Sequence, residues 1–141
     1  MIREANINDY KDIRRLISIL EEREYDEERM LEVFTRLLKD EYQYCYVYET
    51  DHIVGMITLL VKETLHHCDI TGEIIELCVD PECRNQKIGQ QLLEYIENKA
   101  KELKLSELEL SSNVKRKDAH RFYERHLYNK DHFNFTKKIN H

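Results

Sequence analysis

Residues 73–100 hold the richest set of side chains that could do chemistry in this chain. They read EIIELCVDPECRNQKIGQQLLEYIENKA, which predicts a strand, a short polar loop and a long amphipathic helix. Arg84 and Lys87 lie in the loop, and Gly89 lets the backbone approach a ligand where a Cβ would intrude. The first N–H groups of a helix lack partners and carry the positive end of its dipole. The segment therefore predicts an anion cradle, suited to a pyrophosphate, although such a loop also occurs where nothing is bound.

The rest of the chain predicts the elements that would position this segment. Apolar residues at helical spacing predict helices over residues 10–20, 27–38, 89–103 and 118–125. Asn8 or Asp9 offers an N-cap for the first helix, and Asp26 offers one for the second. Strands are predicted over residues 2–5, 44–50, 53–61, 73–79, 108–111 and 133–139. The order β-α-α-β-β-β-α-β-α-β, with antiparallel hairpins in the middle, predicts an α/β fold whose mixed central sheet has helices on both faces.

Length and charge exclude several classes of protein. The chain has 141 residues, which suits one domain over residues 1–141. Its net charge is −6, so we expect no nucleic-acid partner, even though the last thirty residues are basic. No run of 18 apolar residues occurs and the N-terminus has no apolar core of a signal peptide, so we expect no membrane partner.

The cysteines and histidines carry less information. Cys45, Cys68, Cys78 and Cys83 form no CxxC pair, so we expect a reduced protein in the cytoplasm. His66, His67 and Cys68 are adjacent and would point to opposite faces of an extended chain, with no partner pair at ligand spacing. We therefore expect no metal.

Two stretches together resemble the signatures of the GNAT N-acetyltransferases. VDPECRNQKIGQQLLEYIE is similar to the acetyl-CoA-binding motif Gln/Arg-x-x-Gly-x-Gly/Ala of that family, with Arg84 at the first position and Gly89 at the last. AHRFYERHLY, residues 119–128, resembles the second signature, Ala-x-x-Phe-Tyr-x-x-x-Gly-Phe. The element order also matches over residues 2–139, so the resemblance covers the whole chain and implies a GNAT-like, mostly antiparallel sheet.

The resemblance implies an acetyl transfer from acetyl-CoA to a primary amine, which attacks the thioester directly in a ternary complex. Tyr123 matches the family tyrosine that protonates the leaving thiolate, although a core aromatic would look the same. Asn113 resembles a position that contacts the pantetheine arm, although it could equally be a turn residue. The other implied contacts to acetyl-CoA come from the backbone of Leu77, Cys78 and Val79, and from Arg84, Asn85, Gln86, Lys87, Ile88, Gly89 and Gln90.

Glu76 is the candidate general base. Strand alternation puts Glu76, Cys78 and Asp80 on one face, and Ile75, Leu77 and Val79 on the other. A carboxylate between two apolar residues is partly desolvated, which raises its pKa toward useful values. Many members of the family place a base or a water-holding carboxylate near this position. An exposed strand carboxylate is the alternative, and Glu73 is a weaker candidate. For Cys78, buried packing is the better interpretation than a nucleophile.

Two positions depart from the glycines of the family motifs. Lys87 replaces the first glycine of the loop, and we expect it to occupy a helical turn with negative φ. Leu127 replaces the glycine after the Phe-Tyr helix, and we expect a locally remodelled helix end, since Leu at positive φ costs about 1 kcal/mol. Both departures leave open a second function, a GNAT-fold module that binds CoA or an acyl-CoA without turnover.

The acceptor is expected to be a cationic small molecule or a protein amine. An acidic stretch lies between the first two predicted helices, where this family commonly borders its acceptor site: Glu21, Glu22, Glu24, Asp26, Glu27 and Glu28. A homodimer is also possible, because the strand predicted over residues 133–139 could pair across an interface, although a free edge would look the same.

Overall fold

The computed structural model describes residues 1–112 and 115–139. The chain divides into two compact units, Met1–Glu109 and Leu110–His141. The first contains β1 (Ile2–Glu4), a 3-10 turn η1 (Ile7–Asp9), α1 (Tyr10–Glu21), α2 (Glu27–Lys39), β2 (Gln43–Glu49), β3 (Ile53–Thr64), β4 (Asp69–Val79), η2 (Pro81–Cys83) and α3 (Ile88–Glu102). Strand β5 (Leu108–Leu110) begins at the end of this unit, and α4 (Lys117–Arg125) belongs to the second. A single domain over the whole chain stays a prediction.

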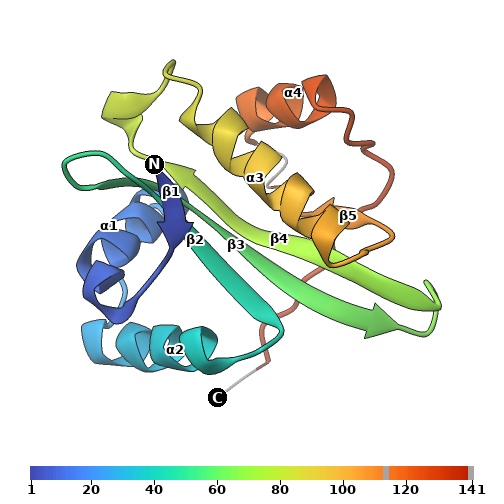
Figure 1. Ribbon diagram of the computed structural model, residues 1–141, viewed down its shortest axis with the longest axis horizontal. Coiled ribbons are helices and arrows are strands. Elements are labelled where there is room, and N and C mark those ends of the chain that lie inside the picture. Colours follow the sequence, from blue (N-terminus) through green and yellow to red (C-terminus); the bar gives the residue numbers. More distant parts are fainter. Residues whose placement is uncertain (113–114, 140–141) are drawn as a thin grey trace. The chain divides into compact units, whose positions relative to one another are not determined.

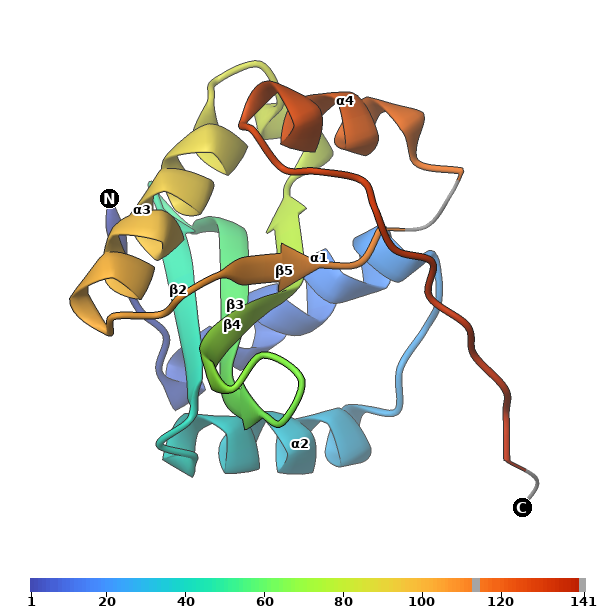
Figure 2. The ribbon, with the colours of Figure 1, turned by 90° about the vertical axis from the view of Figure 1, so that its right-hand side faces the viewer.

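The five strands form one sheet in the order β1-β2-β3-β4-β5. The pairs β1–β2, β2–β3 and β3–β4 are antiparallel, so the predicted mostly antiparallel sheet is confirmed. Figure 1 shows α1 and α2 on one face of this sheet and α3 on the other, and Figure 2 shows β5 at the edge beside β4. The predicted α/β class, with helices on both faces, is therefore confirmed.

Each face of the sheet buries its own set of apolar side chains. The α1–α2 face buries Tyr10, Ile13, Leu16, Phe34, Cys45, Val47, Ile53, Met56 and Cys78. On the opposite face α3 buries Ile88, Leu92, Leu93 and Ile96, spaced as its sequence predicts. A Cβ added at Gly55 of β3 would lie 3.1 Å from both Ile88 and Leu92, so this glycine lets α3 approach the sheet closely.

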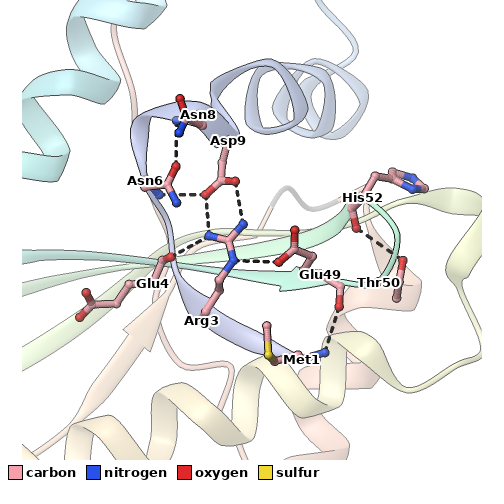
Figure 3. Close-up of polar contacts among 9 residues, drawn as sticks. All are labelled: Met1, Arg3, Glu4, Asn6, Asn8, Asp9, Glu49, Thr50 and His52. Atoms are coloured by element: carbon pink, nitrogen blue, oxygen red, sulfur yellow. Dashed lines mark hydrogen bonds and ion pairs between the residues drawn. The ribbon is translucent and has the colours of Figure 1, made fainter.

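A partly buried ion pair fixes the start of the chain against the sheet (Figure 3). The Arg3 guanidinium donates Nη1 and Nη2 to the two carboxylate oxygens of Asp9, both at 2.9 Å, and Nε to Glu49 at 2.9 Å. Asp9 also accepts the backbone N–H of Asn6 at 2.8 Å, which completes a capping box. These bonds join β1, η1 and the end of β2, and therefore set where α1 begins.

The helix caps confirm one prediction and correct another. Asp26 caps α2, since its carboxylate accepts the N–H of Arg29 at 2.8 Å. Neither Asn8 nor Asp9 caps α1 with its side chain; instead Asn6 caps the short η1 turn and accepts the N–H of Asn8 at 2.9 Å. The difference arises because η1 precedes α1 and takes up the capping side chains.

The second unit contains α4 and an irregular segment after it. The strand predicted over residues 133–139 is wrong, because residues 129–139 have no regular secondary structure. Phe133 and Phe135 are 86% and 90% exposed. An alternating pattern becomes a strand only when a neighbouring strand pairs with its backbone, and no such ladder forms here. Pairing of this segment across a homodimer interface stays a prediction.

No helix within residues 1–112 and 115–139 has the length and apolar character needed to cross a membrane. All four cysteines are free thiols. The expected location in the cytoplasm stays a prediction.

Candidate active site

Glu76 lies at a β-bulge that Thr58 holds open. Ile57 pairs with Leu77 and Leu59 pairs with Ile74, so Thr58 alone opposes both Ile75 and Glu76. The Thr58 hydroxyl accepts the backbone N–H of Glu76 at 2.9 Å and donates to the Glu76 carboxylate. Thr58 is 3% exposed. One buried hydroxyl thus fixes both the backbone and the side chain of the candidate base.

Because of the bulge, the predicted alternation of faces fails before Glu76 and holds after it. From Glu76 onward the alternation holds, because Cys78 is buried as predicted and Asp80, assigned to the same face, is also buried. Ile75 is 44% exposed and shares the bulge with Glu76 instead of forming an opposite apolar wall. The bulge adds a residue between Ile74 and Leu77, and the period of two is lost there.

The surroundings of Glu76 favour a neutral carboxyl. Burial raises the pKa of Glu76; the Thr58 hydrogen bond opposes this shift, and the charge of Glu21 adds to it. The Glu76 charge also contributes, after burial, to the raised pKa values of Cys45 and Tyr25. Cys45 pairs with Thr58 and belongs, like Cys78, to the α1–α2 cluster, so Glu76, which Thr58 holds, faces the α1–α2 side of the sheet.

Residues Leu77–Val79 continue β4 beyond the reach of β5. The start of β5 is level with Gly72, whose N–H donates to the carbonyl of Glu107 at 2.9 Å. Because β5 has three residues and β4 has eleven, β5 can pair with only part of that edge. Cys78 is 4% exposed and packs in the core, so only its backbone could serve a ligand.

Asp80 anchors the loop that leaves β4. Its carboxylate accepts the N–H of Glu82 at 3.0 Å and Nη1 of Arg15 at 2.8 Å, while Nη2 of Arg15 donates to the carbonyl of Ile53 at 2.9 Å. The Glu82 hydrogen bond lowers the pKa of Asp80 most, burial opposes it, and Arg15 lowers it further. An ionised Asp80 thus ties the start of the loop to both α1 and β3.

The loop and the start of α3 have the donors that a pyrophosphate requires. Arg84, Asn85, Gln86 and Lys87 are exposed, and α3 has no side-chain cap at its N-terminus. The first N–H groups, those of Ile88, Gly89 and Gln90, have no partner within a helix. Ile88 places its side chain in the core, 3% exposed, so its backbone alone is a candidate contact. These donors fit the phosphates of CoA.

The expected conformation of Lys87 is wrong. Lys87 has φ 60° and ψ 24°, which is left-handed, and Asn85 also has a positive φ of 75°. All glycines of the chain lack positive φ, so Gly89 is not needed for its backbone conformation. Lys87 therefore adopts the left-handed conformation that a glycine would adopt without strain. Holding a lysine in this conformation costs about 1 kcal/mol of folding free energy.

Tyr123 lies on α4 in the second unit. Its ring is 5.4 Å from that of Phe122 and 6.1 Å from that of Tyr128, measured between centroids. Asn113 lies outside the described residues. Leu127 has φ 69°, so the expected remodelling of the helix end is wrong. The Leu127 N–H donates to the carbonyl of Glu124 at 3.0 Å and that of Tyr128 donates to Tyr123 at 3.1 Å, a closure that needs a left-handed residue at 127.

Glu73 is already paired. Nζ of Lys62 lies 3.0 Å from Glu73 and 2.5 Å from Glu109, so Glu73 is less available as a base than Glu76. The ligand atoms of His67, Glu107 and Glu109 lie within 4.8 Å of one another, which the sequence spacing of His67 did not reveal. Lys62 already supplies a positive charge to this group, and the expectation of no metal stays a prediction.

The fold and these motifs define an acetyltransferase of the GNAT family, to which the chain belongs. The model of the acetyltransferase (GNAT) family matches residues 10–127. Aminoalkylphosphonate N-acetyltransferase of Salmonella typhimurium is 40% identical over 139 residues, covering 98% of this chain and 90% of that protein. The chain is accordingly an N-acetyltransferase enzyme, and these comparisons do not favour a non-catalytic CoA-binding module.

Solved structures show the same fold. A protein of Bacillus halodurans C-125, described as a transcriptional regulator, matches with a TM-score of 0.90 and 23% identity over 99% of both chains. Glucosamine-6-phosphate N-acetyltransferase of Arabidopsis thaliana matches with a TM-score of 0.83 and 18% identity over 99% of this chain and 98% of that one.

Sequence reasoning missed Thr58 and the Arg15–Asp80 pair. Thr58 is 18 positions from Glu76 and Arg15 is 65 from Asp80, so only the strand register and the packing of α1 bring them together. A threonine within an otherwise apolar strand was the available signal for Thr58.

Proposed function

We propose that this enzyme transfers an acetyl group from acetyl-CoA to the primary amine of an aminoalkylphosphonate. The observation that carries the acceptor is the 40% identity, over 98% of this chain, to a protein named for that activity. An aminoalkylphosphonate brings an ammonium group, which suits the acidic residues between α1 and α2. The proposed acceptor thus has the cationic amine expected from the sequence, and it carries an anionic phosphonate in addition.

Glu76 is proposed to accept the proton of the incoming ammonium, directly or through a water molecule. An ammonium has no lone pair and must lose a proton before it can attack a carbonyl. The raised pKa of Glu76, caused chiefly by burial, makes its carboxylate a stronger base than an exposed one. Thr58 orients this carboxylate and keeps it from pairing elsewhere. The nearest alternative, Glu73, is neutralised by Lys62.

The remaining roles concern the co-substrate. When bound, acetyl-CoA supplies the thioester and the leaving thiolate. We assign its pyrophosphate to residues 84–90, because that stretch has exposed bases and an uncapped helix N-terminus. The backbone of Leu77–Val79 is assigned to the pantetheine arm, to which the motif also assigns Asn113. Tyr123 is assigned to protonation of the thiolate, on the strength of its position in the Phe-Tyr motif.

A product assay tests the proposal. The purified protein is incubated with acetyl-CoA and, separately, with 2-aminoethylphosphonate, a polyamine and a lysine peptide, and the products are analysed by mass spectrometry. We expect an N-acetylated product from 2-aminoethylphosphonate at the highest kcat/KM. Acetylation of only the polyamine or the peptide would refute the acceptor while retaining the enzyme class.

A further inference from the structure

Arg23 is the arginine of the acidic loop between α1 and α2. Glu21, Glu22 and Glu24 flank it in sequence, yet its guanidinium forms no ion pair within residues 1–112 and 115–139. It lies instead over the ring of Tyr25, 4.3 Å from the centroid. An arginine stacked on an aromatic ring keeps its N–H groups at the rim available for an anion.

The backbone around Arg23 is held in place. The Arg23 N–H donates to the carbonyl of Ser18 at 3.2 Å, which closes α1, and Glu22 takes the left-handed conformation that this closure needs. Nη2 of Arg14 donates to the carbonyl of Tyr25 at 2.7 Å. Arg23 and Tyr25 are therefore presented by an ordered loop, so that binding needs little reorganisation.

Arg23 and Tyr25 follow the end of α1, which packs on the same face of the sheet as the buried Cys78 of β4. Burial is the main cause of the raised pKa of Tyr25, but the charges of Glu21, Glu76 and Cys78 also contribute. Leu20, near the end of α1, packs against the same core cluster as Cys78, which lies two residues along β4 from Glu76, so the loop that carries Arg23 and Tyr25 begins on the side of the sheet where the candidate base lies. An acceptor with an amine at one end and an anion at the other matches this order of charges.

We propose that Arg23 binds the phosphonate group of the acceptor while the amine faces Glu76. This inference rests on the proposed function and deepens it, since it names the residue that selects an anionic acceptor. A guanidinium matches the oxygens of a phosphonate with two parallel hydrogen bonds. Tyr25 supports the guanidinium from below and forms the wall along which the two-carbon chain of the acceptor lies.

The test compares two acceptors of similar length in four proteins. 2-Aminoethylphosphonate carries the anion, and propylamine lacks it. The proteins are the wild type, Arg23→Gln, Arg23→Lys and the control Lys11→Gln, which removes an exposed charge from the outer face of α1. Thermal unfolding of each variant reports whether it folds.

Arg23→Gln should raise KM for 2-aminoethylphosphonate about tenfold or more, because a charged hydrogen-bonded pair is lost. KM for propylamine and kcat for both amines should stay within about twofold. Arg23→Lys should recover part of the loss, and Lys11→Gln should show none. Equal effects on both amines, or no effect on either, would overturn the proposal.

A binding measurement separates this inference from the proposed function. If the wild type does not acetylate 2-aminoethylphosphonate, the proposed function fails, and the CoA-saturated protein is then titrated with the same compound by calorimetry. Binding that disappears in Arg23→Gln supports the anion site by itself. No binding to the wild type, or equal binding to both proteins, overturns it.

Discussion

The Thr58 hydroxyl contacts Glu76 twice, accepting its backbone N–H at 2.9 Å and donating to its carboxylate. Through these two bonds β3 shapes the bulge in β4 and orients the carboxylate that we assign as the base. Glu76 is half-buried and its pKa is raised mainly by burial, while Thr58 acts in the opposite direction. The hydroxyl therefore positions this carboxylate and limits the rise of its pKa.

Replacing Thr58 by valine should lower kcat/KM and move its acidic limb to higher pH. Thr58 stabilises the ionised carboxylate, so its removal raises the pKa of Glu76 further and less of the base is ionised at a given pH. Valine has nearly the same shape and leaves no cavity, but it also removes the acceptor of the Glu76 N–H. pH–rate profiles of Thr58→Val and Thr58→Ser check this. The serine variant keeps the hydroxyl and should show the wild-type pH profile. An acidic limb that does not shift in the valine variant would refute the effect of Thr58 on the pKa of Glu76.

Tyr123→Phe should lower turnover about tenfold or more while leaving CoA affinity near that of the wild type. The variant removes the phenolic proton and keeps the ring that packs near Phe122 and Tyr128. Steady-state kinetics and calorimetric titration with CoA provide the two readouts. A weaker CoA affinity with unchanged kcat would assign Tyr123 to binding.

Glycine at Lys87 or Leu127, two of the left-handed positions, should stabilise the protein. Lys87 has φ 60° and Leu127 has φ 69°, and a side chain costs about 1–2 kcal/mol in this region, of which glycine's greater freedom in the unfolded chain cancels part. We expect Lys87→Gly and Leu127→Gly each to raise the free energy of unfolding by about 0.5–1 kcal/mol. Chemical denaturation measures this change. Gly89→Ala, at negative φ, is the contrasting control, for which no relief of strain is expected.

The Arg3–Asp9 pair should make stability depend on pH in the acid range. The hydrogen bond from Arg3 is the main cause of the lowered pKa of Asp9, and burial opposes it. A carboxylate whose pKa is lowered in the folded state stabilises the protein fully when the pH is above its pKa in the unfolded state, about 3.9. This contribution is lost as the pH falls through the folded-state pKa.

Asp9→Asn should therefore cost about 2 kcal/mol at neutral pH, and the difference from the wild type should shrink below about pH 4. Urea denaturation at a series of pH values measures both effects. Glu32→Gln is the matched control, since Glu32 pairs with Arg29 and Arg36 at an exposed position and should cost little. A difference that stays constant with pH would refute the role given to the Asp9 charge.

Local patterns in the sequence were enough to predict most of the elements. Asp26 caps α2 and the apolar stripe of α3 is buried, because caps and helical spacing act within a few residues. The strand over residues 133–139 could not be settled this way, since a strand exists only with a neighbour.

The candidate site likewise has features that the local sequence predicts and features that depend on contacts between distant residues. The motif around Arg84 and Gly89 and the carboxylate of Glu76 could be found along the chain. The bulge at Glu76 could not, because it depends on a hydroxyl from β3 that only the register of two strands brings near. The left-handed conformation of Lys87 was also missed, because a lysine in a sequence does not indicate the positive φ that a glycine at this position would suggest.

The proposed mechanism requires Glu76 to be the base of an acetyl transfer to an amine. It is tested most directly by following thiol release from acetyl-CoA with 2-aminoethylphosphonate across a range of pH, in the wild type and in Glu76→Gln. We expect a wild-type rate that rises as the carboxyl ionises, and a rate in Glu76→Gln that is lower by about 100-fold or more and lacks this limb. A Glu76→Gln variant with the wild-type rate and pH profile would contradict it.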